Sequence, residues 1–166
     1  SDYSKLIPGT LEVVAECRER NYKIGSTSGY LPGMLAINQV DAEKQGYVPD
    51  ATFGASDVKR GRPYAHMVLR NIIELDVSPV QSVVKIDDTL TGIEEGLNAG
   101  CWAIGLAISG NEVGVPLEEW NAFSDEVKQK HRDRVYPTMY QRGAHYVIDS
   151  IANLMPCLDD IEARLR

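Results

Sequence analysis

Two adjacent carboxylates, Asp87 and Asp88, are the residues of this chain with the clearest capacity for chemistry. They follow directly on an apolar run at residues 83–86 and precede a small polar turn at 89–92. Carboxylate oxygens are hard ligands that suit Mg²⁺, and a carboxylate-bound Mg²⁺ commonly also binds phosphate. Alternatively, one aspartate caps the helix that follows while the other is exposed, because Asp is a favoured N-cap residue. The local sequence leaves both interpretations open.

A second candidate is the hydroxyl-rich turn at residues 26–29, which contains Thr27, Ser28 and Gly29. It follows a short predicted strand and precedes a predicted helix, so its hydroxyls and backbone N–H groups are suited to hold a phosphate. Taken alone, these residues are explained more simply as a polar turn with capping hydroxyls.

The third candidate is Arg62, in a basic stretch at residues 59–63 that ends in Pro63. Arginine binds phosphate through two N–H groups at once, and proline favours the start of a helix. Each basic residue of the stretch, considered singly, is explained more simply as solvated surface charge. The histidines and cysteines do not cluster at metal-ligand spacing, so they predict no further metal site.

The hydrophobic pattern predicts the elements that must position these groups. Around the acidic pair, an apolar run, a helical segment ending at residue 100 and a second apolar run at 101–108 predict one parallel β-α-β unit. Further strands are expected at 22–25, 51–54 and 144–148, and helices at 10–20 with Thr10 as N-cap, 32–46, 63–75, 117–142 in two pieces broken near Pro137, and 151–165. Strands that alternate with helices predict an α/β fold, with a parallel sheet covered on both faces.

The carboxyl ends of the strands are where such a sheet binds its ligands, and the acidic pair lies at one of them. Each of the three candidates is a weak signal by itself. Their order along the chain is more informative: a hydroxyl turn, then a basic residue before a helix, then an acidic strand end.

The composition excludes several classes of protein. A net charge of −7 without a cluster of Lys and Arg argues against a nucleic-acid-binding protein. The three cysteines are widely spaced, so they form neither a disulfide framework nor a zinc site and suit a reducing compartment. No apolar run is long enough to cross a membrane, and no signal peptide is apparent. We therefore expect one soluble, cytoplasmic domain without nucleic-acid or membrane partners.

The three candidates and their order resemble the haloacid dehalogenase superfamily of phosphotransferases, and within it the phosphonatase family. The stretches that carry the resemblance are LIPGTLEV, KIGSTSGY, GRPYAHM, KIDDTLTGIEEGLNAGCWAIGLAISGNEVG and GAHYVIDSI. KIGSTSGY and GRPY are specific to the phosphonatase family rather than to the superfamily. The resemblance implies a Rossmann-like parallel sheet with helices on both faces, the haloacid dehalogenase-like core.

The resemblance also implies a chemistry. Enzymes of the phosphonatase family are Mg²⁺-dependent and split the C–P bond of phosphonoacetaldehyde into acetaldehyde and phosphate, through a Schiff base on a cap-domain lysine and an aspartyl-phosphate. Carried over by position, Arg62 would neutralise the transferring group and Asp88 would bind Mg²⁺. Thr27, Ser28 and Gly29 would hold phosphoryl oxygens, with the principal ligand among them left open.

One departure from the superfamily concerns the metal site. The superfamily commonly places a second acidic residue four positions after the metal-binding aspartate, and here that position is Gly92. Asp87, the neighbour of Asp88, is then expected to supply the second carboxylate.

The larger departure is at the amino end. The family begins with a strand that carries the nucleophilic aspartate in a DxAGT-type motif, followed by the cap with its lysine, and neither is found here. Residues 1–166 are therefore expected to be the carboxyl-terminal part of the core domain. The missing strand would lie between the strands near residues 22–26 and 82–86, so the chain is expected to be inactive alone and to need that segment in cis or in trans. The full-length protein is a possible homodimer.

Two other functions remain open at this stage. One is a phosphatase or phosphomutase of the same superfamily, because the absent cap determines the substrate. The other is a non-catalytic phosphate-binding or scaffolding remnant, because the two covalent catalysts are missing.

Overall fold

A computed structural model describes residues 9–28, 49–108 and 117–166 of the chain. The strands are β1 (Gly25–Ser28), β2 (Ala51–Gly54), β3 (Val84–Asp87), β4 (Trp102–Leu106) and β5 (Tyr146–Ile148). The helices are α1 (Thr10–Glu19), α3 (His66–Leu75), α4 (Leu90–Ala99), α5 (Leu117–Ala122), α6 (Asp125–Arg142) and α7 (Leu154–Leu165), with 3-10 turns η2 (Ala55–Asp57), η3 (Val80–Ser82) and η4 (Ile151–Asn153). The helix expected at 32–46 and the residue Gly29 lie outside the described residues.

The described strands all pair in parallel but form two separate sheets. β1 pairs with β2, and the second sheet has the order β3-β4-β5, with Ile86 opposite Ile104 and Gly105 opposite Val147. Within the described ranges, no backbone ladder joins β1 to β3. The parallel α/β architecture predicted from the alternation of strands and helices is confirmed.

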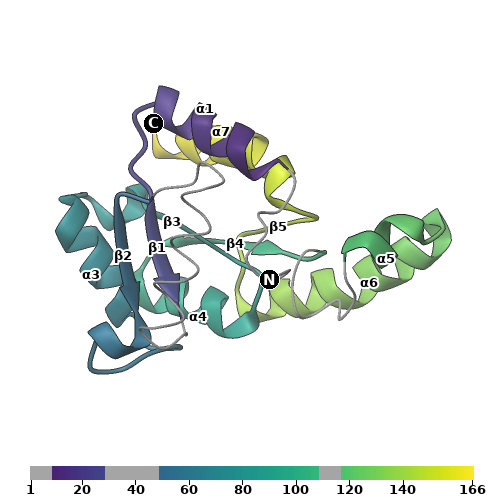
Figure 1. The fold of residues 1–166 in the computed structure, drawn as a ribbon, viewed down its shortest axis with the longest axis horizontal. Helices are drawn as coiled ribbons and strands as arrows, with labels where there is room; N and C mark the ends of the chain where they lie inside the picture. Colours follow the sequence, from purple (N-terminus) through teal and green to yellow (C-terminus); the bar gives the residue numbers. More distant parts are fainter. Residues whose placement is uncertain (1–8, 29–48, 109–116) are drawn as a thin grey trace.

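Helices cover both faces of the strands (Figure 1). α1 and α7 lie side by side on one face, whereas α3, α4 and α6 lie on the other. α3 packs on β1 and β2, α4 packs on β3 and β4, and α3 also contacts α4. The α3–α4 contact therefore connects the two sheets through their common helical layer.

The core is divided in two by the alternation of side chains along β4. Ala103 faces the α4 and α6 side, where it packs with Ile93 and Met139, and Ile104 faces the α1 and α7 side with Leu158. Successive side chains of a strand point to opposite faces, so a strand that is buried on both faces needs an uninterrupted apolar sequence. This explains why residues 101–108 are apolar throughout.

The predicted central unit, β3-α4-β4, is confirmed. Thr89 is the N-cap of α4, and its side-chain oxygen accepts a hydrogen bond from the backbone N–H of Gly92 at 3.0 Å. α4 ends at Gly100, whose φ of 87° is in the left-handed region that favours glycine. The N-cap is thus neither Asp87 nor Asp88, so the capping alternative for the acidic pair is wrong.

β1 lies further along the chain than the sequence pattern suggested. The strand was expected at residues 22–25 but begins at Gly25. The backbone N–H of Ile24 donates to the Asp50 side chain at 2.8 Å, which replaces a ladder hydrogen bond just before the strand. As a consequence Ser26 and Thr27 belong to the strand and not to a turn.

Three helix boundaries also differ from the expectations. The N-cap of α1 is Gly9, with φ of 90°, and not Thr10. α3 begins at His66, after a turn that includes Pro63. α6 runs through Pro137, and the expected break falls instead just before α6, at its N-cap Ser124.

The continuity of α6 at Pro137 has a local physical reason. A proline inside a helix removes one backbone hydrogen bond and costs about 3 kcal/mol. On both sides of Pro137 α6 is well anchored, because Arg132 and Tyr136 donate to the Asp149 carboxylate at 2.8 and 2.6 Å and Met139 is fully buried.

No described helix is long and apolar enough to cross a membrane.

Candidate functional site

Side chains from three separate segments meet where β1 and β3 end. Thr27 comes from β1, Arg62 from the loop between η2 and α3, and Asp87 from the last position of β3. Arg62 Nη2 lies 3.0 Å from Asp87 Oδ2 and donates to Thr27 Oγ1 at 3.4 Å. The structure therefore brings together three of the residues that the sequence singled out.

Alternation along β3 places Lys85 and Asp87 on the same face, toward α4. Both side chains are buried, at 9% and 8% exposed. α4 makes room for them with two glycines one turn apart: a Cβ on Gly92 would lie 1.9 Å from Asp87 Cγ, and one on Gly96 would lie 2.6 Å from Lys85 Cβ. Only glycine at these two positions lets the helix lie this close to charged strand residues.

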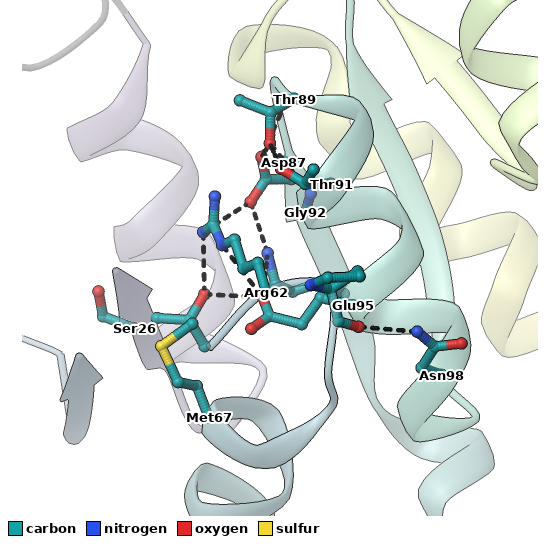
Figure 2. Close-up of polar contacts among 12 residues, drawn as sticks. Ser26, Arg62, Met67, Asp87, Thr89, Thr91, Gly92, Glu95 and Asn98 are labelled. Atoms are coloured by element: carbon teal, nitrogen blue, oxygen red, sulfur yellow. Dashed lines mark hydrogen bonds and ion pairs between the residues drawn. The ribbon is translucent and has the colours of Figure 1, made fainter. Parts of the chain in front are cut away.

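Four charged side chains form a closed ring, which we call the charge ring: Arg62, Asp87, Lys85 and Glu95. Lys85 Nζ lies 2.6 Å from Asp87 Oδ2 and 3.4 Å from Glu95 Oε1. Arg62 closes the ring, with Nη2 on Asp87 and Nε 3.5 Å from Glu95 Oε1. Figure 2 shows Arg62 between Asp87 and Glu95. Two positive and two negative charges alternate, so the ring is neutral.

Thr27 joins this ring from the other sheet. Its hydroxyl lies 3.4 Å from Glu95 Oε1, to which it can donate, while it accepts from Arg62. β1 and β3 are thus connected by side chains, although no backbone ladder joins them in the described ranges. The Ser28 backbone ends β1, but its side chain lies outside the described residues, as does Gly29.

The pKa of each carboxyl follows from burial and from its neighbours. Burial alone would raise the pKa of Asp87, but Lys85, Arg62 and the Thr89 hydroxyl hold it below its ordinary value. Burial and then repulsion from Asp87 raise the pKa of Asp88. Burial also raises the pKa of Glu95, and the attraction of Lys85 and Arg62 only partly offsets it.

The two adjacent aspartates therefore differ in their suitability for a metal ion. Both oxygens of Asp87 are engaged, Oδ2 by Lys85 and Arg62 and Oδ1 by the Thr89 backbone N–H and hydroxyl at 2.8 and 2.7 Å. Asp88 is a half-buried carboxylate beside another negative charge, and no described side chain donates to it. A divalent cation would relieve that repulsion, so Asp88 fits a Mg²⁺ ligand, whereas Asp87 would first have to release a cation of the charge ring.

Within the described ranges, no group of three or more His, Cys, Asp or Glu side chains is arranged to hold a metal. The acidic pair alone thus represents an incomplete ligand set. Magnesium binding at Asp87 and Asp88 stays a prediction.

Two members of the charge ring, Lys85 and Glu95, were not identified from the sequence. A signal for Lys85 was present, because a lysine in an apolar run two residues before Asp87 shares its face of the strand. Glu95 lies three residues after Gly92, on the same face of the helix, but nothing in the sequence distinguishes it from the partly exposed Glu94 beside it.

Comparison with known proteins identifies the wider group. Residues 1–100 match the family model described as haloacid dehalogenase-like hydrolase. The chain is 44% identical over 166 residues to a phosphonoacetaldehyde hydrolase of Vibrio cholerae, covering 99% of this chain and 61% of the relative. It is 40% identical over 165 residues to that of Bordetella pertussis, covering 99% and 60%.

Solved structures give the same picture. A phosphonoacetaldehyde hydrolase-like protein from Oleispira antarctica superposes with a TM-score of 0.96 at 46% identity, over 98% of this chain and 59% of that one. A putative β-phosphoglucomutase from Thermotoga maritima, at 18% identity and a TM-score of 0.66 over 95% of this chain and 63% of that one, shares the fold alone. The chain spans about 60% of the length of the curated relatives it matches.

Proposed function

The chain belongs to the haloacid dehalogenase-like hydrolase family, and we propose that it carries the phosphate- and Mg²⁺-binding part of a phosphonoacetaldehyde hydrolase. The observation that carries the proposal is the convergence of Thr27, Arg62 and Asp87 at the ends of β1 and β3. The proposal takes its substrate from relatives named phosphonoacetaldehyde hydrolase, which are 40–44% identical over nearly the whole chain.

In this proposal Arg62 is the residue that acts on the transferring phosphoryl group. Its Nε and Nη2 face the charge ring and Thr27, which leaves Nη1 without a contact among the described residues. Nη2 is held by Asp87 and Thr27 and Nε lies 3.5 Å from Glu95, so the planar group presents Nη1 in a preferred direction. Negative charge on phosphoryl oxygens is then stabilised without reorganisation of the arginine.

Thr27, Ser28 and Gly29 are proposed to hold the phosphoryl oxygens from the β1 side. The Thr27 hydroxyl lies beside Arg62, so one anion can contact both residues. Asp88, assisted by Asp87, is proposed to hold Mg²⁺, which when bound would neutralise further phosphoryl charge.

We further propose that another segment, in cis or in trans, supplies the nucleophilic aspartate and the Schiff-base lysine. This proposal is supported by the two separate sheets, whose β1 and β3 are connected in the described ranges only by side chains. A strand between them would bring its carboxyl end to Thr27 and Asp87. The completed protein is the form in which we expect activity, in the cytoplasm and with a homodimer as a possible assembly.

The test is phosphate release from phosphonoacetaldehyde by the completed protein, compared with Arg62→Ala and Arg62→Lys. Loss of a preorganised charge-stabilising donor reduces kcat by roughly 10²–10³-fold, so we expect a fall of that size for Arg62→Ala. Lysine keeps the charge but loses the two-point contact, so a smaller fall is expected.

Full activity of Arg62→Ala would contradict the role given to Arg62. Hydrolysis of phosphate esters without cleavage of phosphonoacetaldehyde would favour the phosphatase or phosphomutase alternative. Phosphate binding without any turnover would favour the non-catalytic alternative.

A further inference from the structure

Glu95 is a fully buried carboxylate in the middle of α4, with 0% of its surface exposed. An isolated charge in such a position is strongly unfavourable, so a buried glutamate needs paired charges around it. Its Oε1 has three neighbours: Lys85 Nζ at 3.4 Å, Thr27 Oγ1 at 3.4 Å and Arg62 Nε at 3.5 Å. Glu95 therefore contacts both cations of the charge ring and the residue that joins β1 to it.

Arg62 depends on such contacts for its orientation. It lies in a loop and not on a helix or strand, so the backbone alone leaves its long side chain several rotamers. Asp87 holds Nη2 at 3.0 Å, and Glu95 Oε1 lies 3.5 Å from Nε, an ion-pair distance at which Nε makes no hydrogen bond. Opposite charges beside two nitrogens of one planar group restrict the orientation of the guanidinium and hence the direction of Nη1.

The helix that carries Glu95 is itself well anchored. Thr89 caps its first turn, and Ile93 is 1% exposed in the core against β4 and α6. Because Gly92 and Gly96 have no side chains, α4 lies close to β3, and Glu95 contacts Lys85 and Arg62 from the α4 side. Lys85 balances the second carboxylate, so the ring holds Arg62 without leaving a net buried charge.

We propose that Glu95 is a positioning residue for Arg62, and that Lys85 serves it as the balancing cation. Glu95 touches neither the phosphoryl group nor the metal in this arrangement, and it acts only through the guanidinium. The inference rests on the proposed function, because it assumes that Arg62 binds the transferring group.

A double-mutant cycle in the completed protein tests this inference, with Glu95→Gln, Arg62→Ala and the double variant assayed for phosphate release from phosphonoacetaldehyde. Replacing a residue that orients a metal ligand typically changes activity by roughly 10–100-fold, and by analogy Glu95→Gln is expected to lower kcat by roughly that factor. The loss should fall on kcat more than on KM, because the oriented contact matters most in the transition state. In the Arg62→Ala background the same change should have no further effect.

Glu94→Gln is the matched control. Glu94 is the neighbouring residue of α4, but it pairs with Arg142 at 2.7 Å on the surface, away from the ring. We expect wild-type kcat for this variant. Thermal unfolding of each variant, followed by circular dichroism, measures structural damage separately, and Arg62→Gln replaces Arg62→Ala in the cycle if the alanine variant does not fold.

The outcomes separate this inference from the proposed function. If Arg62→Ala loses activity but Glu95→Gln lowers kcat by the same factor in both backgrounds, Glu95 does not act through Arg62 and the inference is wrong. Wild-type kcat for Glu95→Gln also overturns it. If Arg62→Ala keeps full activity, the proposed role of Arg62 itself has failed.

Discussion

Gly92→Ala is the substitution whose effect follows most directly from the geometry of the site. The added Cβ would lie 1.9 Å from Asp87 Cγ and 2.2 and 2.3 Å from its two carboxylate oxygens. Ordinary contact between carbon atoms needs about 3.5–4 Å, so the carboxylate or the helix has to move by about 1.5–2 Å. A displacement of that size breaks the contacts of Asp87 with Lys85 at 2.6 Å and with Arg62 at 3.0 Å.

The expected free-energy change combines opposing effects. Glycine to alanine inside a helix stabilises by about 1 kcal/mol. Overpacking costs about 1–3 kcal/mol, and disruption of a buried ion pair costs up to about 3–5 kcal/mol. With the ion pair lost, the net destabilisation is therefore about 3–7 kcal/mol, and in a protein of this size each kcal/mol lowers Tm by about 2–4 °C. A fall in Tm on the order of 10 °C is expected.

The assay is thermal unfolding of the completed protein, followed by circular dichroism. Gly61→Ala is the control, because its Cβ would meet only Ala55 Cβ at an ordinary 3.5 Å. A change within about 0.5 kcal/mol is expected there. In an Asp87→Ala background Gly92→Ala should cost much less, since the group that it displaces is gone.

The exchanged variant Asp87→Gly/Gly92→Asp tests the same packing through a recovery of activity instead of a loss of stability. The Cβ of residue 92 would lie 1.9 Å from the present position of Asp87 Cγ, so the side chain of residue 92 would enter the space that the Asp87 carboxylate fills now. It should therefore recover part of the activity that Asp87→Gly loses. A wild-type Tm for Gly92→Ala would refute the close packing of Asp87 against α4 on which this reasoning depends.

The edges of β1 and β3, the metal ligand Asp88 proposed above and the ion pair of Asp149 with Arg132 each lead to a further prediction. The 166-residue chain alone should lack a cooperative monomeric melt by circular dichroism. In the described residues, about eight backbone groups on the edges of β1 and β3 have no ladder partner, and each costs roughly 1–3 kcal/mol where it is buried. A sharp monomeric transition would contradict this prediction. Asp88→Asn should weaken Mg²⁺ binding to the completed protein by roughly 10-fold or more, as measured by isothermal titration calorimetry. The substitution removes the carboxylate whose repulsion from Asp87 the cation would relieve. An unchanged affinity would place the metal elsewhere. Burial opposes ionisation of Asp149, but hydrogen bonds from Arg132 and Tyr136 lower its pKa below the ordinary 3.8. The ionised Asp149 therefore stabilises the fold above pH 3.8, and this stabilisation is lost as the pH falls through the lowered pKa. Asp149→Asn should flatten the acid side of a curve of Tm against pH, and a curve parallel to that of the wild type would argue against the Arg132–Asp149 ion pair.

Much of the fold was predictable because its signals are local. The apolar runs before Asp87 and after Gly100 predicted the central β-α-β unit, and the structure confirms it. The errors occurred where a side chain replaced a backbone contact. Asp50 takes the Ile24 N–H and delays β1, and the contacts of α6 with Asp149 compensate for Pro137. Such compensation comes from residues distant in the sequence, which no local pattern contains.

The candidate site was likewise predictable only in part. The types and order of Thr27, Arg62 and Asp87 suggested a phosphate site, and the comparisons place the chain in a hydrolase family. Their roles in binding phosphate and Mg²⁺ stay predictions that the variants above can test.

By itself the sequence determined the alternation of strands and helices in the described ranges, and that an aspartate ends a buried parallel strand. Tertiary structure alone decided which partners the carboxylates of the site have. Gly92 and Gly96 let α4 approach β3, so Glu95 is buried against Lys85 and Arg62 while Glu94 stays at the surface. The physical reason is that the energy of a buried charge depends on the distance to its counter-charges and on the water removed around it. Both quantities exist only once segments that are far apart in the chain have packed together.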